Sequence, residues 1–158
     1  MTILLLSEPN YAGNIIIILA NLPDFLRTPI LKKRMLEFFS MTETEQDEII
    51  NNALEAGPTV PFPNFSKLFK TWLEVLTTMS EDQRNLMFLK YFNAITNTPE
   101  KLINFNLDGI YEIFCSLDKD KKNVISKTLK NVIFRLEAEQ KRKLKLIIPE
   151  KSKMEFGI

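Results

Sequence analysis

One pattern recurs along this sequence at intervals of 38 residues, and it restricts what the chain can fold into. The pattern is an aromatic residue or Leu, two further residues, a Met or Leu, and then a Ser, Thr or Asp that opens a charged run. The three Met or Leu positions are Met41, Met79 and Leu117. Apolar residues recur ten, six and three positions before each of them and eight positions after. This is the spacing of one helix face, so the pattern predicts a helix on each side.

The residue after each of these positions has the properties of a helix N-cap. Thr42 with Glu45, and Ser80 with Gln83, fit the capping box. In this motif the cap hydroxyl accepts a hydrogen bond from the third helical amide, and the third side chain bonds back to the cap amide. Asp118 is able to cap a helix by itself. One helix therefore ends near each cap and the next begins at once, which predicts antiparallel hairpins with short turns.

The predicted fold is all-α, built from antiparallel helical hairpins. A period of 38 residues lies within the range of about 34 to 47 residues that helical repeats use when they stack into solenoids. This favours a short, HEAT-like α-solenoid, with a compact helical bundle as the alternative. No linker is long or polar enough to divide the chain. We expect one domain over 1–158, comprising an N-terminal segment (1–27), helical hairpins (28–136) and a basic tail helix with the C-terminus (137–158).

Proline and glycine mark the expected helix boundaries. Thr28-Pro29 and Thr98-Pro99 each fit an N-cap followed by Pro at the first helical position. The segment Gly57–Pro63 contains three prolines, which predicts an extended connector before a helix that begins near Asn64. Gly57 is well placed to end the helix that follows Thr42. Further boundaries are a helix start near Asn106 and a tail helix from Glu137 to Ile147 that stops before Pro149.

The residue types that most catalytic sites need are missing. The 158 residues include no His and one Cys, Cys115, which we interpret as a small core residue. Zinc, haem and non-haem iron sites draw on several His or Cys ligands, and triad nucleophiles need an imidazole base. Carboxylates cluster at Glu43, Glu45, Asp47 and Glu48, as is typical of a first helical turn. We therefore expect no enzymatic activity, no cofactor and no metal.

A net charge of +1 conceals two oppositely charged parts of the chain. Glu37–Glu100 contains ten acidic and four basic residues, whereas Lys119–Lys153 contains twelve basic and four acidic ones. Such asymmetry often marks a surface that meets an oppositely charged partner. The densest basic run lies on the tail helix. It is either the solvated face of that helix, a protein-docking surface, or a site for nucleic acid or anionic lipid.

These features predict a non-catalytic protein–protein interaction module, an adaptor or accessory subunit of a larger complex. Its partner would be another protein or a second copy of the chain. The alternative is a regulatory protein that binds nucleic acid or an anionic membrane surface through the basic C-terminal third. The candidate partner-binding residues are Val60 and Phe62 of the connector, and Lys141, Arg142, Lys143 and Lys145 of the tail helix.

We also expect no small-molecule substrate and a cytoplasmic location. The single cysteine suits a reducing compartment. Two apolar runs, Ile3–Leu6 and Ile15–Leu22, are each much shorter than the roughly 20 residues that a membrane-spanning helix needs.

Overall fold

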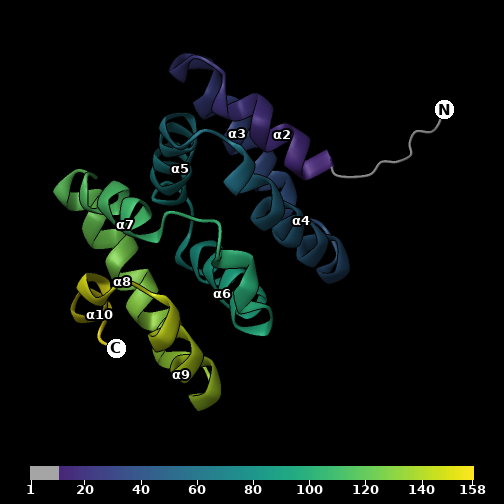
Figure 1. Cartoon of the computed structure of the whole chain (residues 1–158). Coiled ribbons are helices and arrows are strands. Elements are labelled where there is room, and N and C mark those ends of the chain that lie inside the picture. The colour runs from purple at the N-terminus through teal and green to yellow at the C-terminus, as the bar shows by residue number, and fades with distance from the viewer. Residues whose placement is uncertain (1–10) are drawn as a thin grey trace.

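A computed structural model describes residues 11–158 as an all-α protein, with no strand in that range (Figure 1). Nine α-helices and two short 3-10 helices contain 82% of the described residues, which confirms the predicted fold class. The apolar run Ile3–Leu6 lies outside the described residues. The helices are α2 (Tyr11–Ala20), α3 (Asp24–Phe38), α4 (Glu43–Ala56), η1 (Gly57–Thr59), α5 (Phe62–Leu76), α6 (Glu81–Asn97), η2 (Pro99–Leu102), α7 (Leu107–Cys115), α8 (Lys119–Arg135), α9 (Ala138–Ile147) and α10 (Glu150–Phe156).

The helices form two rows, because from α2 to α8 each helix packs against the next but one along the chain. Helices α2, α4, α6 and α8 make one row, and α3, α5 and α7 make the other (Figure 1). Helix α10 extends the first row by packing on α8, while α9 lies against α6 and η2. This arrangement is what helical hairpins with short turns produce when they stack.

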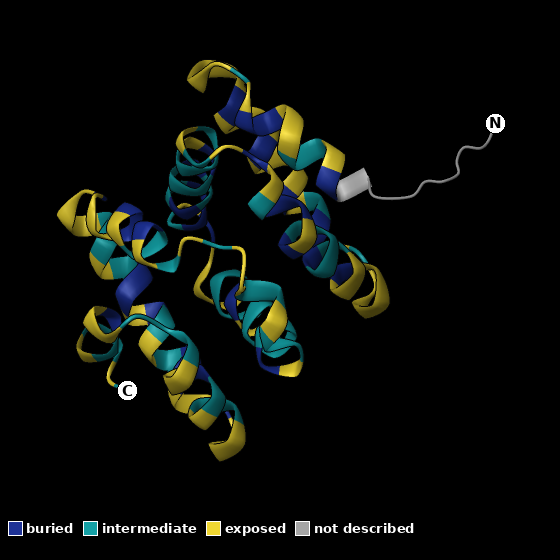
Figure 2. Cartoon of the chain, viewed as in Figure 1, coloured by how far each residue is buried: buried dark blue, intermediate teal, exposed yellow. Residues whose placement is uncertain are grey.

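The sides of the helices that face the neighbouring helices carry the buried apolar residues, and the outer sides carry the exposed ones (Figure 2). Phe38, Leu76 and Phe114 occupy the same place in the 38-residue pattern and are 4%, 0% and 5% exposed. The main apolar cluster takes residues from α2 through α8, and a smaller one joins the end of α8 to α9. The spacing of apolar residues therefore identified the core faces correctly.

Reciprocal hydrogen bonds fix the starts of α4 and α6, as the capping boxes predicted. Thr42 Oγ1 accepts from the amide of Glu45 at 3.2 Å, and the Glu45 carboxylate accepts from the amide of Thr42 at 3.0 Å. Ser80 and Gln83 form the same pair at 3.2 and 3.1 Å. Asp118 is the N-cap residue of α8, but its exposed side chain makes no capping hydrogen bond, contrary to expectation.

A second set of contacts closes the turns from the other side. The residue four positions after each cap reaches back to the end of the preceding helix. The contacts run from Gln46 Nε2 to the Phe38 carbonyl (3.0 Å), from Arg84 Nη1 to the Met79 carbonyl (2.5 Å), and from Lys122 Nζ to the centroid of the Phe114 ring (5.6 Å). Residues at equivalent places in the pattern thus bind back across the same turn, although one interaction is a cation–π contact and the other two are hydrogen bonds.

The start of α3 differs from the prediction. The helix begins at Asp24 rather than at Thr28-Pro29, and Pro29 lies inside it. The cause is Arg27, which is 3% exposed and donates hydrogen bonds to the carbonyls of Leu19 (3.0 Å) and Leu22 at the end of α2. Its guanidinium also pairs with Asp24 at 2.5 Å. These bonds hold the first turn of α3 against α2, so the helix starts earlier.

The predicted connector between Gly57 and Pro63 is mostly helical. Gly57 begins η1, and α5 starts at Phe62 with Pro63 in its first turn, where a missing amide does no harm. Gly57 does end α4, but with a right-handed φ of −50°. A Cβ at this position would lie 2.7 Å from the Phe105 ring. A close approach of side chains, and not a left-handed backbone, therefore requires glycine here.

The remaining boundaries agree with the sequence except at the C-terminus. Thr98-Pro99 opens the short helix η2, and the side chain of Asn106 accepts from the amide of Gly109 at 2.9 Å to start α7. Helix α9 ends at Ile147, as predicted. Pro149 does stop α9, but it is also the N-cap residue of α10, which the sequence analysis did not predict.

The N-cap residues Ser80 and Asp118 are expected to contribute different amounts to the free energy of unfolding. Ser80→Ala removes a capping hydrogen bond and should lower the free energy of unfolding by about 1 kcal/mol. Asp118→Ala removes no such bond and should lower it by clearly less. Urea denaturation of both variants measures the difference, and equal losses would contradict the capping geometry described here.

Candidate functional site

The two connector residues predicted to contact a partner do not form an exposed loop. Val60 is 6% exposed and belongs to the main apolar cluster. Phe62 is half-buried, with its ring centroid 6.2 Å from that of Phe65. Its ring also lies so close to Gly109 that a Cβ there would be 2.5 Å away. Val60 is thus buried because α5 begins earlier than predicted, and a role of Val60 and Phe62 in partner binding stays a prediction.

The four basic residues of the tail helix have separate roles. Lys143 is half-buried and donates to the Thr96 carbonyl on α6 at 3.2 Å, so it helps to attach α9. Arg142 pairs with Glu139 on its own helix at 2.6 Å. Lys141 and Lys145, one turn apart, have no carboxylate partner among the described residues. The basic run is thus divided between helix packing and a free surface.

An exposed aromatic ring lies beside these free lysines. Phe134, near the end of α8, is 78% exposed, and Lys141 Nζ lies 5.3 Å from the centroid of its ring. Lys127 and Lys130 occupy the same exposed face of α8 one and two turns earlier. In the described part of the chain neither forms an ion pair. We refer to Lys127, Lys130, Phe134, Lys141 and Lys145 as the basic patch.

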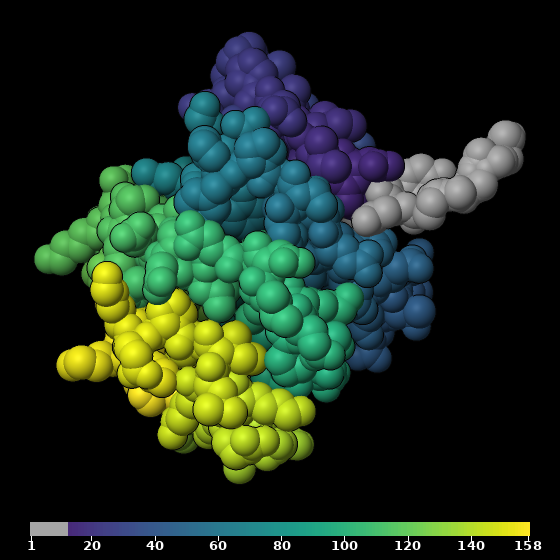
Figure 3. All heavy atoms as spheres, in the orientation of Figure 1, coloured from purple at the N-terminus to yellow at the C-terminus, as the bar shows by residue number. Residues whose placement is uncertain are grey.

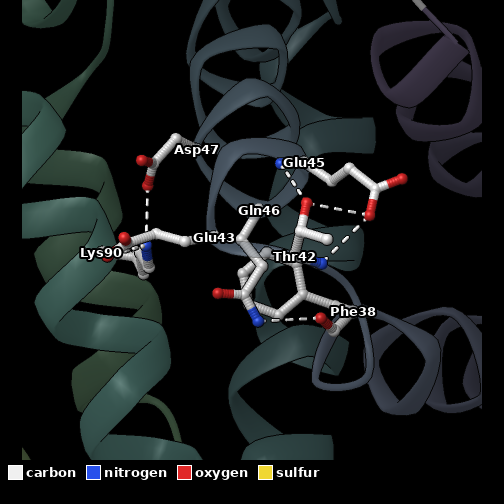
Figure 4. A network of polar contacts seen from close by, with 7 residues as sticks. All are labelled: Phe38, Thr42, Glu43, Glu45, Gln46, Asp47 and Lys90. Carbon is white, nitrogen blue, oxygen red and sulfur yellow. Dashed lines mark hydrogen bonds and ion pairs between the residues drawn. The ribbon is translucent and has the colours of Figure 1, made fainter.

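A buried lysine joins α6 to α4. Lys90 is 8% exposed, and its Nζ lies 2.8 Å from Asp47 Oδ1 and 3.5 Å from Glu43 Oε2 (Figure 4). The sequence pattern indicated that these carboxylates lie in the first turn of a helix. It did not predict the contact with Lys90, which lies 43 residues after Asp47. No group of three or more metal-ligating side chains occurs within residues 11–158. The cluster therefore acts as an ion pair between helices.

Glu45 lies in the same helical turn, but its carboxylate binds Thr42. The backbone and hydroxyl hydrogen bonds from Thr42 hold the pKa of the Glu45 carboxyl below its usual value (Figure 4). Both bonds favour the ionised form of the carboxyl group. The carboxylate thus stabilises the start of α4 and is not poised as a general acid or base.

A cavity of about 460 Å³ that is partly open to solvent lies between the two rows of helices, and every α-helix from α2 to α10 contributes to its lining. Along α5 the rings of Phe65, Phe69 and Trp72 stack at centroid distances of 5.7 and 5.6 Å. These rings are half-buried and pack against the main apolar cluster. On the face drawn in Figure 3, side chains form a largely continuous surface over the space between the ribbons. The lining is apolar almost throughout.

Few polar side chains line this cavity. Arg34 and Glu37 pair with each other at 3.2 Å, and Ser152 donates to the Pro149 carbonyl at 2.7 Å. The Tyr91 hydroxyl has no hydrogen-bond partner among the described residues, and burial raises its pKa. Tyr91 and Trp72, whose indole N–H makes no hydrogen bond among the described residues either, thus line the cavity with unused polar groups.

Cys115 is exposed, which corrects its interpretation as a core residue. It is the last residue of α7, and the side chains of its neighbours Ile113 and Phe114 take the buried positions. Loss of solvent and the adjacent Cys115 raise the pKa of Tyr111 to about 12.

Comparison of the chain with protein-family models, with curated proteins and with solved structures finds no match. None of the described helices is long and apolar enough to cross a membrane.

Removing one carboxylate tests the ion pair between helices. Asp47→Asn leaves the buried ammonium of Lys90 with only the more distant Glu43, so the free energy of unfolding should fall by about 1 to 2 kcal/mol. This estimate is reduced because Asp47 itself is partly exposed. Glu48→Gln, an exposed change on the same helix, is the control in urea denaturation. A loss no larger than the control's would show that the pair is solvated.

The lowered pKa of Glu45 gives a pH dependence with a defined sign. A carboxyl group whose pKa is lower in the folded state stabilises that state above its ordinary value of 4.5. This stabilisation is lost as the pH falls through the folded-state pKa. Wild-type protein should therefore lose stability relative to Glu45→Gln on acidification. Urea titrations at several pH values below neutrality measure the difference, and a constant gap would refute the role of the carboxylate.

Proposed function

We propose that this protein is a non-catalytic interaction module that binds an acidic segment of another protein through the basic patch. An adaptor or accessory subunit of a larger complex fits this role. The observation that carries the proposal is Phe134, an aromatic ring 78% exposed beside Lys141, on a helix face with further lysines that form no ion pair among the described residues. The proposal includes a cytoplasmic location and the absence of catalysis.

The chemistry of the patch supports a protein partner. Exposed aromatic residues are enriched among the side chains that dominate binding energy at protein interfaces. Basic side chains around such a ring steer an oppositely charged partner and form a polar rim. The lysines of the patch have no task within the described fold, whereas Lys143 and Lys90 do. Their charge is therefore available to a partner.

Phosphate binding has weaker support. Three other cations of the C-terminal third are already paired, in Arg142–Glu139, Lys153–Glu150 and Lys121–Glu74. Single-stranded nucleic acid sites combine a continuous basic groove with several stacking rings. The patch has one exposed ring and separate lysines, which suits an acidic peptide better.

The experiment compares two matched pairs of variants as bait in an extract of the native cells. Phe134→Ala with Lys141→Ala removes the centre of the patch. Phe25→Ala with Lys33→Ala removes an equally exposed ring, 75% exposed, and an exposed lysine from α3. We expect wild-type protein and the α3 variant to capture the same acidic protein. The patch variant should capture it at least about tenfold less well.

Equal capture by both variants would contradict the proposal. The alternative function is tested with vesicles containing phosphatidylserine and with duplex DNA, at low and at high salt. Counterion release makes binding to phosphates fall steeply with added salt. Tight, salt-sensitive binding to either probe that the patch variant loses would replace the protein partner by an anionic surface.

A further inference from the structure

Several apolar side chains in the interior of the protein are only partly covered by their neighbours. Half-buried apolar side chains from both rows, among them Ile49, Phe69, Trp72 and Phe105, line the same cavity of about 460 Å³. Protein interiors are normally packed with few voids larger than a water molecule. These side chains line the cavity, and the packing of the described residues leaves part of their apolar surface uncovered.

The shape and chemistry of this cavity restrict its occupant. Its volume lies within the range of about 300 to 1,000 Å³ that is typical of small-molecule sites. Residues from α2 at one end of the molecule and from α10 at the other contribute to the wall, so the space is elongated. Among the described residues of the wall, the charged ones are Arg34 and Glu37, which pair with each other. A nucleotide or a peptide helix with charged groups finds no matching partners there.

Water is a poor occupant as well. A buried water molecule needs two to four polar partners, and a cavity lined by apolar side chains stays dry and binds apolar molecules. Tyr91 and Trp72 line this wall, and neither the Tyr91 hydroxyl nor the Trp72 indole N–H makes a hydrogen bond within residues 11–158, so they offer a small polar area in an otherwise apolar space. A mostly apolar molecule with a single polar end matches that distribution.

We infer that the cavity binds one molecule with a single long aliphatic chain, of the fatty-acyl class. The chain would lie along the ring stack of α5, with the rows of helices on either side. This site is separate from the basic patch and goes beyond the proposed adaptor function. It also departs from the expectation, based on sequence alone, that the protein has no small-molecule ligand.

The single tryptophan of the sequence is a built-in reporter for this site. Trp72 lines the cavity, and its ring centroid lies 5.4 Å from that of Tyr91. Bromine quenches tryptophan fluorescence only on close contact. A stearic acid dibrominated in the middle of its chain is therefore the probe, and unbrominated stearic acid is the control ligand.

We expect the brominated acid to quench Trp72 and to saturate at one molecule per protein, and the unbrominated acid to reverse the quenching by competition. Ala53→Leu places extra carbon atoms in the cavity wall and should weaken binding at least about tenfold. Ala138→Leu adds the same atoms at an exposed position of α9 and should leave binding unchanged. Ile95→Phe is a second filling variant, for the case in which Ala53→Leu does not fold.

Quenching that does not saturate would overturn the inference, because it indicates adsorption to the surface. The inference also fails if a folded filling variant, judged by its thermal melting, binds the acid as well as wild-type protein does. Phe134→Ala separates the two proposals. Unchanged binding of the acid by this variant places the ligand away from the basic patch, and lost binding places it on the patch and overturns the cavity assignment.

Discussion

The turns before α4 and α6 are held from two sides, and the two-row arrangement depends on this. Before α8, where Asp118 makes no capping hydrogen bond, only Lys122 reaches back across the turn, to the Phe114 ring. A cap residue fixes where the second helix starts, and a side chain one turn further on binds the end of the first helix. With both helix ends fixed across so few residues, consecutive helices are forced to run antiparallel. Each helix then meets the next but one, which gives two rows. Whether the three hairpins are copies of one sequence repeat stays a prediction.

The interior follows from this geometry. The side chains on the facing sides of the two rows determine whether the space between them is filled. The wide aromatic face of α5 fills part of it, and about 460 Å³ remain. Apolar wall that no side chain covers forgoes burial and dispersion contacts, which costs stability. An apolar ligand would offset that cost, which connects the fold to a binding role.

Local signals in the sequence predicted local structure well. The capping boxes at Thr42 and Ser80 and the end of α9 at Ile147 depend on neighbouring residues, and the sequence identified all three. The prediction at Thr28-Pro29 failed because Arg27 binds the carbonyls of another helix, a contact that no local pattern shows. Val60 was expected on the surface for the same reason, since its burial depends on where α5 begins.

The candidate sites were less predictable than the helices. Charge counts located the basic third of the chain. Only the packing of α9 on α6 shows that Lys143 binds the neighbouring helix, whereas Lys141 lies beside the exposed Phe134 ring. A pattern of apolar residues predicts which face of a helix is buried. It does not predict how completely the side chains of two such faces fill the space between the helices. The sequence therefore did not predict the cavity that Trp72 and the phenylalanines of α5 line.

The central claim is that the ligand-free interior is apolar and incompletely filled, and pressure tests it most directly. Unfolding eliminates internal voids, so pressure favours the unfolded state in proportion to them. With Trp72 fluorescence as the signal, we predict a volume decrease on unfolding at or above about 100 mL/mol, the upper end of the usual range. A decrease near about 20 mL/mol would show a filled interior and would contradict the account.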